Sequence, residues 1–143
     1  MDPEIVSLRS HRSSFPIKVT HFPPRLISSR PTPAVLIAPA TGVPASFYAP
    51  YAEHLSSLGC PVLTLDYRFS GLSYPADVDP KDRAAVLKAL GSDEAQGVTI
   101  AREWKWDMEA ALGWVVGRYR EREIVVIGAS VGGACRFLRE EES

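Results

Sequence analysis

Residues 128–132 contain a serine flanked by two glycines, and of all stretches in this chain they are the best suited to chemistry. They read Gly-Ala-Ser-Val-Gly, which fits the pattern G-x-S-x-G with Ser130 at its centre. Where such a stretch turns sharply from a strand into a helix, the serine hydroxyl is exposed and the glycines avoid a clash with the neighbouring elements. The backbone N–H of the next residue, Val131, then points at a developing oxyanion. The pattern predicts Ser130 as a nucleophile and Val131 as an oxyanion donor.

Three buried strands are predicted, and together they would form a sheet that positions this motif. Each is apolar at nearly every residue, which is typical of a parallel sheet covered on both faces. The strands are expected at residues 34–38, 61–66 and 124–127. A hairpin of residues 5–8 and 17–20 is expected at the edge of the sheet, because residues 17–20 alternate between apolar and polar.

Two amphipathic helices are expected to cover the sheet. The first spans residues 47–58, with Ser46 as its N-cap and Gly59 just beyond its C-terminus. The second spans residues 101–118, and apolar residues recur at helical spacing in both. These residues are Tyr48, Tyr51, Ala52, Leu55 and Leu58 in the first helix, and Trp104, Met108, Ala111, Leu112 and Val115 in the second.

Two further segments lie between these elements. A shorter helix is expected to open at Asp79 and Pro80 and to end before Gly91, since proline suits the first helical position and glycine the position after the end. The charged residues 118–123 are expected to form a solvated turn.

Three segments of the chain resemble the α/β-hydrolase superfamily, and within it the serine-aminopeptidase-like or lysophospholipase-like hydrolases. Residues 35–42 resemble the family's strand and oxyanion loop, and residues 65–73 its D-Y-R-G-x-G-x-S loop. Residues 128–132 resemble its nucleophile elbow. The resemblance spans residues 15–137. It implies an α/β fold class, with one incomplete α/β-hydrolase domain over residues 1–143: a parallel-type sheet flanked by helices that stops after the elbow.

This resemblance also implies a site and a reaction. The backbone N–H of Thr41 would be the second oxyanion donor, and Ser130 would attack an ester or peptide bond without a cofactor or a metal ion. The chain departs from the family at two positions, because Ala129 stands where many relatives have histidine and Phe69 replaces the first glycine of the second loop. Residues 75–99 exceed what a minimal family member needs, and we expect a surface insertion there rather than a lid.

The acid and the histidine of the family's triad follow the serine along the chain. Only 13 residues follow Ser130 here, and none of them is histidine. His11, His21 and His54 lie upstream, and none has an expected path to the carboxyl edge of the sheet. A serine hydroxyl without an adjacent base is a poor nucleophile near neutral pH. We therefore expect weak or absent catalysis from this chain by itself, and a non-catalytic binding role is the corresponding alternative.

A dinucleotide-binding fold is a second alternative. Residues 128–133 differ from the fingerprint G-x-G-x-x-G only where Ser130 stands, but a side chain there hinders the approach of a pyrophosphate. The fingerprint also requires a following strand and an acidic residue about 20 residues later, and the chain ends before either.

Composition and charge limit the partners and the location that we expect for this chain. The net charge of −1 favours neither nucleic acid nor an anionic membrane, and no apolar stretch approaches the length of a membrane span. Cys60 and Cys135 fit neither a metal site nor a disulfide framework, so we expect a cytoplasmic protein. The strand at residues 124–127 would be an unprotected apolar edge, through which the chain is expected to self-associate.

Overall fold

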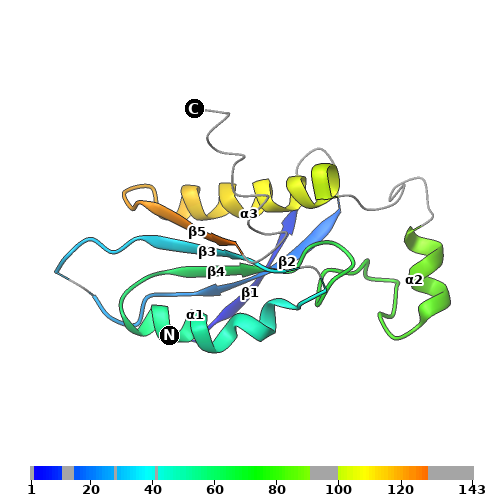
Figure 1. Cartoon of the computed structure of the whole chain (residues 1–143), viewed down its shortest axis with the longest axis horizontal. Helices are drawn as coiled ribbons and strands as arrows, with labels where there is room; N and C mark the ends of the chain where they lie inside the picture. The colour runs from blue at the N-terminus through cyan, green and yellow to red at the C-terminus, as the bar shows by residue number, and fades with distance from the viewer. Residues whose placement is uncertain (1, 11–14, 28, 41, 91–99, 129–143) are drawn as a thin grey trace.

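A mixed five-stranded sheet forms the centre of the part of the chain that the structure describes (Figure 1). The computed structural model describes residues 2–10, 15–27, 29–40, 42–90 and 100–128. Within these ranges the strand order is β1-β2-β4-β3-β5. The strands are β1 (Glu4–Arg9), β2 (Pro16–Phe22), β3 (Ala34–Ala38), β4 (Val62–Leu65) and β5 (Ile124–Gly128).

The three predicted buried strands are confirmed as parallel neighbours. β3 lies between β4 and β5 and runs parallel to both, with Val35 opposite Val62 and Ala38 opposite Gly128. All five residues of β3 are buried, as expected for a strand that is apolar on both faces and covered by helices. The predicted hairpin is also confirmed, since β1 pairs antiparallel with β2, and β2 pairs antiparallel with β4.

Two helices cover the opposite faces of the sheet, as predicted (Figure 1). α1 (Ala49–Ser57) packs on one face, where Ala52 contacts a cluster that includes Val35 and Ile37. α3 (Lys105–Arg118) packs on the other face, where Met108, Ala111 and Val115 are buried. These three residues belong to the predicted apolar stripe, which confirms the face that this helix turns to the sheet.

The predicted start and buried face of the first helix are partly wrong. A 3₁₀ turn at Ala45–Tyr48 precedes α1, so Ser46 lies inside this turn and the N-cap of α1 is Tyr48. The α-helix begins at Ala49 because Pro50 lacks an N–H and is tolerated only in the first turn. Tyr51 and Leu58, which were expected to be buried, are 46% and 53% exposed. Gly59 does end the helix, with a φ of 94°.

α2 (Arg83–Leu90) lies apart from the sheet and its two covering helices (Figure 1). It begins three residues later than Pro80, because Asp82 accepts the N–H of Ala85 at 3.2 Å and so caps the first turn. Asp79 instead accepts the N–H of Lys81 in the preceding turn. None of the residues of α2 is buried.

Two other boundaries differ from the prediction. A π-helical turn at Ile100–Trp104 leads into α3, where a regular helix was expected. Arg122, expected in a solvated turn, is half-buried and donates to the hydroxyl and the carbonyl oxygen of Thr32. The turn after α3 is therefore fixed to the segment that leads into β3.

Candidate active site

The candidate site lies at the carboxyl edge of the three parallel strands, where open α/β sheets bind their ligands. β3 ends at Ala38, β4 at Leu65 and β5 at Gly128. Ala38 and Gly128 are register partners, so the chain leaves β3 and β5 at the same level of the sheet. The segments that follow these strands therefore begin side by side.

Asp66, the first residue after β4, links the loops that follow two of these strands. Its side chain is buried, and Oδ1 accepts the N–H of Ala45 at 2.7 Å. Oδ2 accepts the N–H of Leu72 at 3.0 Å. Burial raises the pKa of the Asp66 carboxyl above its ordinary value of 3.8, and the two backbone N–H groups oppose that shift. One carboxylate thus holds the loop after β3 and the loop after β4.

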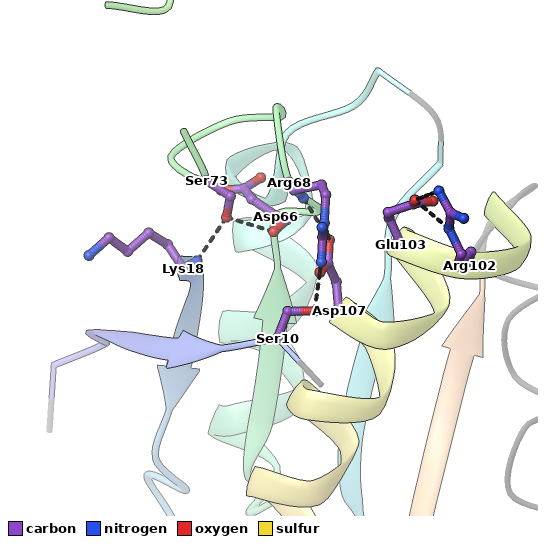
Figure 2. Close-up of polar contacts among 8 residues, drawn as sticks. All are labelled: Ser10, Lys18, Asp66, Arg68, Ser73, Arg102, Glu103 and Asp107. Atoms are coloured by element: carbon purple, nitrogen blue, oxygen red, sulfur yellow. Dashed lines mark hydrogen bonds and ion pairs between the residues drawn. The ribbon is translucent and has the colours of Figure 1, made fainter. Parts of the chain in front are cut away.

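The loop after β4 is wound tightly around Asp66. Ser73 is fully buried, where its hydroxyl donates to the carbonyl oxygen of Asp66 at 2.7 Å and accepts the N–H of Lys18 at 2.8 Å (Figure 2). Gly71 has a φ of 52°, and a Cβ there would lie 2.2 Å from Oδ1 of Asp66. Phe69, where the family has glycine, also has a positive φ of 61°. Position 69 therefore has the backbone conformation that glycine favours, although its residue is phenylalanine.

The loop after β3 is anchored on both sides of position 41. The N–H of Ala40 donates to the hydroxyl of Tyr48 at 3.1 Å. The N–H of Val43 donates to the carbonyl oxygen of Ala40, which closes a turn. Ala45 is held by Asp66, as described above. The described part of this loop is therefore attached to α1's preceding turn and to β4.

A buried ion pair joins the loop after β4 to α3. Arg68 is 1% exposed, and its NH2 group lies 2.8 Å from Oδ1 of Asp107, which is itself fully buried. The same carboxylate accepts the backbone N–H of Arg68 at 2.8 Å, and the hydroxyl of Ser10 accepts a further N–H from the guanidinium (Figure 2). The guanidinium also lies over the ring of Phe15, at 4.8 Å from its centroid. The pair fixes α3 against the site edge.

Aromatic and charged side chains continue this edge at the start of α3. The ring of Trp104 stacks on that of Tyr67, with centroids 4.8 Å apart and planes at 10°. Trp104 belongs to the predicted apolar stripe, and this contact and its packing against the core agree with that prediction. The carboxylate of Glu103 is buried and pairs with Arg102, one turn before Asp107 (Figure 2).

The three predicted site residues, Ser130, Val131 and Thr41, lie outside the described residues. What the structure places is the chain on either side of Thr41, at Ala40 and Gly42, and the strand that ends two residues before Ser130. Their predicted roles as nucleophile and oxyanion donors remain predictions.

The described histidines lie away from the carboxyl edge. His21 pairs with Leu63 in the register of β2 and β4, about 10 Å before Asp66 along the strand at 3.3 Å per residue. Both of its ring nitrogens are occupied, Nδ1 by Glu4 at 2.8 Å and Nε2 by the hydroxyl of Tyr119. His54 is exposed in the last turn of α1. His11 lies outside the described residues.

The sequence prediction missed the two side chains that organise this edge. Asp66 was recognised as part of a family motif, but no contact was assigned to it. Asp107 was not singled out at all, because its partner Arg68 is 39 residues away in the sequence. The only available signal was a charged residue on the predicted buried side of the 101–118 helix, one position before Met108.

Comparison with solved structures shows which fold this sheet belongs to. A carboxyl esterase from Bacillus coagulans is 16% identical with a TM-score of 0.68, and the match covers 94% of this chain and 38% of the esterase. An α/β serine hydrolase without a lid from Xanthomonas campestris is 15% identical with a TM-score of 0.65, and the match covers 99% and 57% of the two chains. An α/β serine hydrolase homologue from Coxiella burnetii is 16% identical with a TM-score of 0.61, and the match covers 94% and 55%.

These similarities establish the predicted α/β-hydrolase fold for this chain, which spans between 38% and 57% of the length of those three proteins. No protein-family model matches the chain, and no curated protein matches it by sequence. The antiparallel β2 and the position of β5 as the fifth strand also favour this fold over a dinucleotide-binding one, in which the fingerprint follows the first strand.

None of the helices in the described ranges combines the length and the apolar character that crossing a bilayer requires.

Proposed function

We propose that this chain supplies the nucleophile and the oxyanion hole of a serine hydrolase that cleaves ester or peptide bonds. Ser130 is the nucleophile, and the backbone N–H groups of Val131 and Thr41 are the oxyanion donors. The observation that carries the proposal is the pairing of Ala38 with Gly128. Thr41 follows the first by three residues and Ser130 follows the second by two, so both segments leave adjacent parallel strands at one edge of the sheet.

The chemistry follows from these roles. The Oγ of Ser130 attacks the substrate carbonyl carbon, and the carbonyl π electrons move to the oxygen, where the two N–H groups stabilise the negative charge. When the tetrahedral intermediate collapses, the leaving group departs with a proton and the acyl group remains on Ser130. A water molecule then cleaves this acyl-serine ester, which releases the acid and restores the hydroxyl. The hydroxyl proton must pass to a base. The histidines that the structure describes, His21 and His54, lie away from this edge, and we propose that the chain by itself is a weak catalyst.

Esters are the favoured substrates, because the proteins of similar structure include a carboxyl esterase. We also propose a cytoplasmic location, which the spacing of the two cysteines supports, since it fits no disulfide framework.

The experiment compares hydrolysis of p-nitrophenyl acetate by the wild-type chain, Ser130→Ala and Ser29→Ala, with and without added imidazole. Imidazole stands in for the base, and the exposed Ser29 is the matched control. We expect a slow wild-type rate. Imidazole should raise this rate more than tenfold, after subtraction of the hydrolysis that imidazole causes without protein. Ser130→Ala is expected to abolish that increase, and Ser29→Ala to leave it unchanged.

Equal rates for the wild type and Ser130→Ala, in the presence and absence of imidazole, would overturn the proposal. A fast rate without imidazole that Ser130→Ala abolishes would support the nucleophile. That result would overturn the expectation that the chain lacks its own base.

A further inference from the structure

We propose that Asp66 is the positioning residue for the loop after β3, which carries the oxyanion donor of the proposed function, Thr41. This inference rests on the proposed function and assigns to the site a residue outside its nucleophile and oxyanion donors. Asp66 touches no reacting atom in this account, because it acts through the backbone of the loop after β3.

The first step is the way in which the loop around Thr41 is anchored. On one side, the N–H of Ala40 donates to Tyr48, and on the other, the N–H of Ala45 donates to Oδ1 of Asp66 at 2.7 Å. The bond to Asp66 is buried and charge-assisted, and such bonds are about twice as strong as neutral ones. Ala45 is four positions after Thr41, so the carboxylate fixes the described end of the short segment that follows the proposed oxyanion donor.

The second step is that Asp66 is itself fixed to the sheet. Its backbone N–H donates to the carbonyl oxygen of Lys18 at 3.1 Å, and its carbonyl oxygen accepts the Ser73 hydroxyl at 2.7 Å. Its second carboxylate oxygen accepts the N–H of Leu72, and the backbone of Gly71 packs directly against the carboxylate. A side chain held in this way fixes the loop after β3 relative to β4.

The third step concerns what a loosened loop would do to the reaction. An oxyanion donor must lie about 2.7–3.1 Å from the oxygen that becomes charged, and removing one donor lowers kcat by about 10²–10³. Release of Ala45 from Asp66 would loosen the loop from which the proposed function takes this donor. The loss should appear in kcat and not in KM, because the oxygen carries its charge only in the transition state.

The test uses two variants that break the same bond from opposite sides. Asp66→Ala removes both carboxylate oxygens, so neither the Ala45 N–H nor the Leu72 N–H keeps its acceptor. Ala45→Pro removes the donated N–H and leaves Asp66 intact. Pro44 already has a ψ of 154°, which is the conformation that a residue before proline requires. Ser56→Ala is the matched control, because it removes a buried hydroxyl-to-carbonyl bond of 2.6 Å to Pro23.

Two readouts are measured for each variant: amide hydrogen exchange in residues 39–45, and the Ser130-dependent, imidazole-assisted hydrolysis described above. We expect Asp66→Ala to speed exchange of the Ala45 N–H at least tenfold. We also expect both Asp66→Ala and Ala45→Pro to lower the Ser130-dependent kcat at least tenfold, with KM within about threefold. Ser56→Ala should change kcat by less than twofold, even if it lowers the unfolding temperature as much.

Two results would overturn the inference. One is an Ala45 amide whose exchange does not respond to Asp66→Ala. The other is a loosened loop with an unchanged Ser130-dependent kcat in both variants, or a loss of the same size in Ser56→Ala. Failure of the proposed function is seen separately, because it appears in the comparison of the wild type with Ser130→Ala before any Asp66 variant is made.

Discussion

Asp66 and Gly71 approach each other so closely that the residue type at each position depends on the other. A Cβ on position 71 would meet Oδ1, Cγ and Oδ2 of Asp66 at 2.2–2.4 Å. Position 71 also has a φ of 52°, which is unfavourable for residues with a side chain. The glycine is therefore required both by its backbone conformation and by the carboxylate beside it.

Gly71→Ala is expected to lower the free energy of unfolding by about 3 kcal/mol or more, from the strain of the positive φ together with the clash. Gly42→Ala is the matched control, because Gly42 has a φ of 75° but nothing within 4 Å of an added Cβ. It should cost only about 1 kcal/mol, the cost of the φ alone. Urea denaturation of the two variants measures both values, and equal losses would show that Asp66 does not crowd position 71.

The raised pKa of Asp66 gives its contribution to stability a defined pH dependence. The unfolded carboxyl loses its proton near 3.8 and the folded one at higher pH, so the folded state binds more protons between these values. The contribution is fully present below the unfolded pKa and is lost as the pH rises through the folded pKa. The free energy of unfolding of the wild type, relative to Asp66→Asn, should therefore fall as the pH rises from below 3.8. A difference that stays flat or rises over this range would contradict the shift.

At the residue scale, the sequence identified which segments carry chemistry but not the contacts that organise them. The motif at residues 65–73 was recognised, and Phe69 was identified as standing at a glycine position. Its positive φ explains why glycine is usual at that position. The two bonds of the Asp66 carboxylate could not be predicted, since Ala45 lies 21 residues away and the bond depends on how β3 and β4 pair.

At the scale of elements, α3 is fixed to the site edge by the buried pair of Arg68 and Asp107. Removing one partner of such a pair leaves an uncompensated charge in the interior, which costs about 3–5 kcal/mol. Ser10 allows a comparison with the loss of a neutral partner, because its hydroxyl accepts an N–H from the same guanidinium at 2.8 Å.

Asp107→Asn is expected to lower the free energy of unfolding by at least about 3 kcal/mol, and Ser10→Ala by about 1–2 kcal/mol. Chemical denaturation at neutral pH measures both losses. If Asp107→Asn costs no more than Ser10→Ala, the pair does not hold α3 in the way described.

The regular elements were the best predicted features, because their hydrophobic patterns are local. Apolar runs located β3, β4 and β5, and the stripe through Met108, Ala111 and Val115 located the buried face of α3. The pattern failed in α1, where Tyr51 and Leu58 lie on the solvent side of the helix while Ala52 and Ser56 are buried. The face there is set by the small residues that allow close packing on the sheet, which hydrophobicity alone does not reveal.

At the scale of the whole molecule, β5 is paired on one side by β3 and has no second partner strand among the described residues. Val125, in the middle of the strand, is 37% exposed. An apolar strand with unpaired backbone groups is a template for pairing with another chain.

We expect the chain to self-associate through β5, so that sedimentation gives a mass above that of the monomer. Val125→Lys should shift the distribution toward the monomer, because a charge on an edge strand opposes such pairing. Ile5→Lys is the control, since Ile5 is 62% exposed on β1, at the opposite edge of the sheet. A wild-type monomer with a cooperative thermal transition above about 45 °C would contradict this expectation.

The most direct test of the central claim is the position at which an ester leaves its acyl group on the chain. The chain is incubated with p-nitrophenyl acetate and imidazole, digested, and analysed by mass spectrometry. We expect the acetyl group on Ser130, in an amount well above that on exposed serines such as Ser29, and no acetyl group in the same peptide of Ser130→Ala. Acetylation of Ser130 at no more than the level of Ser29 would contradict the claim that this fold presents Ser130 as a nucleophile.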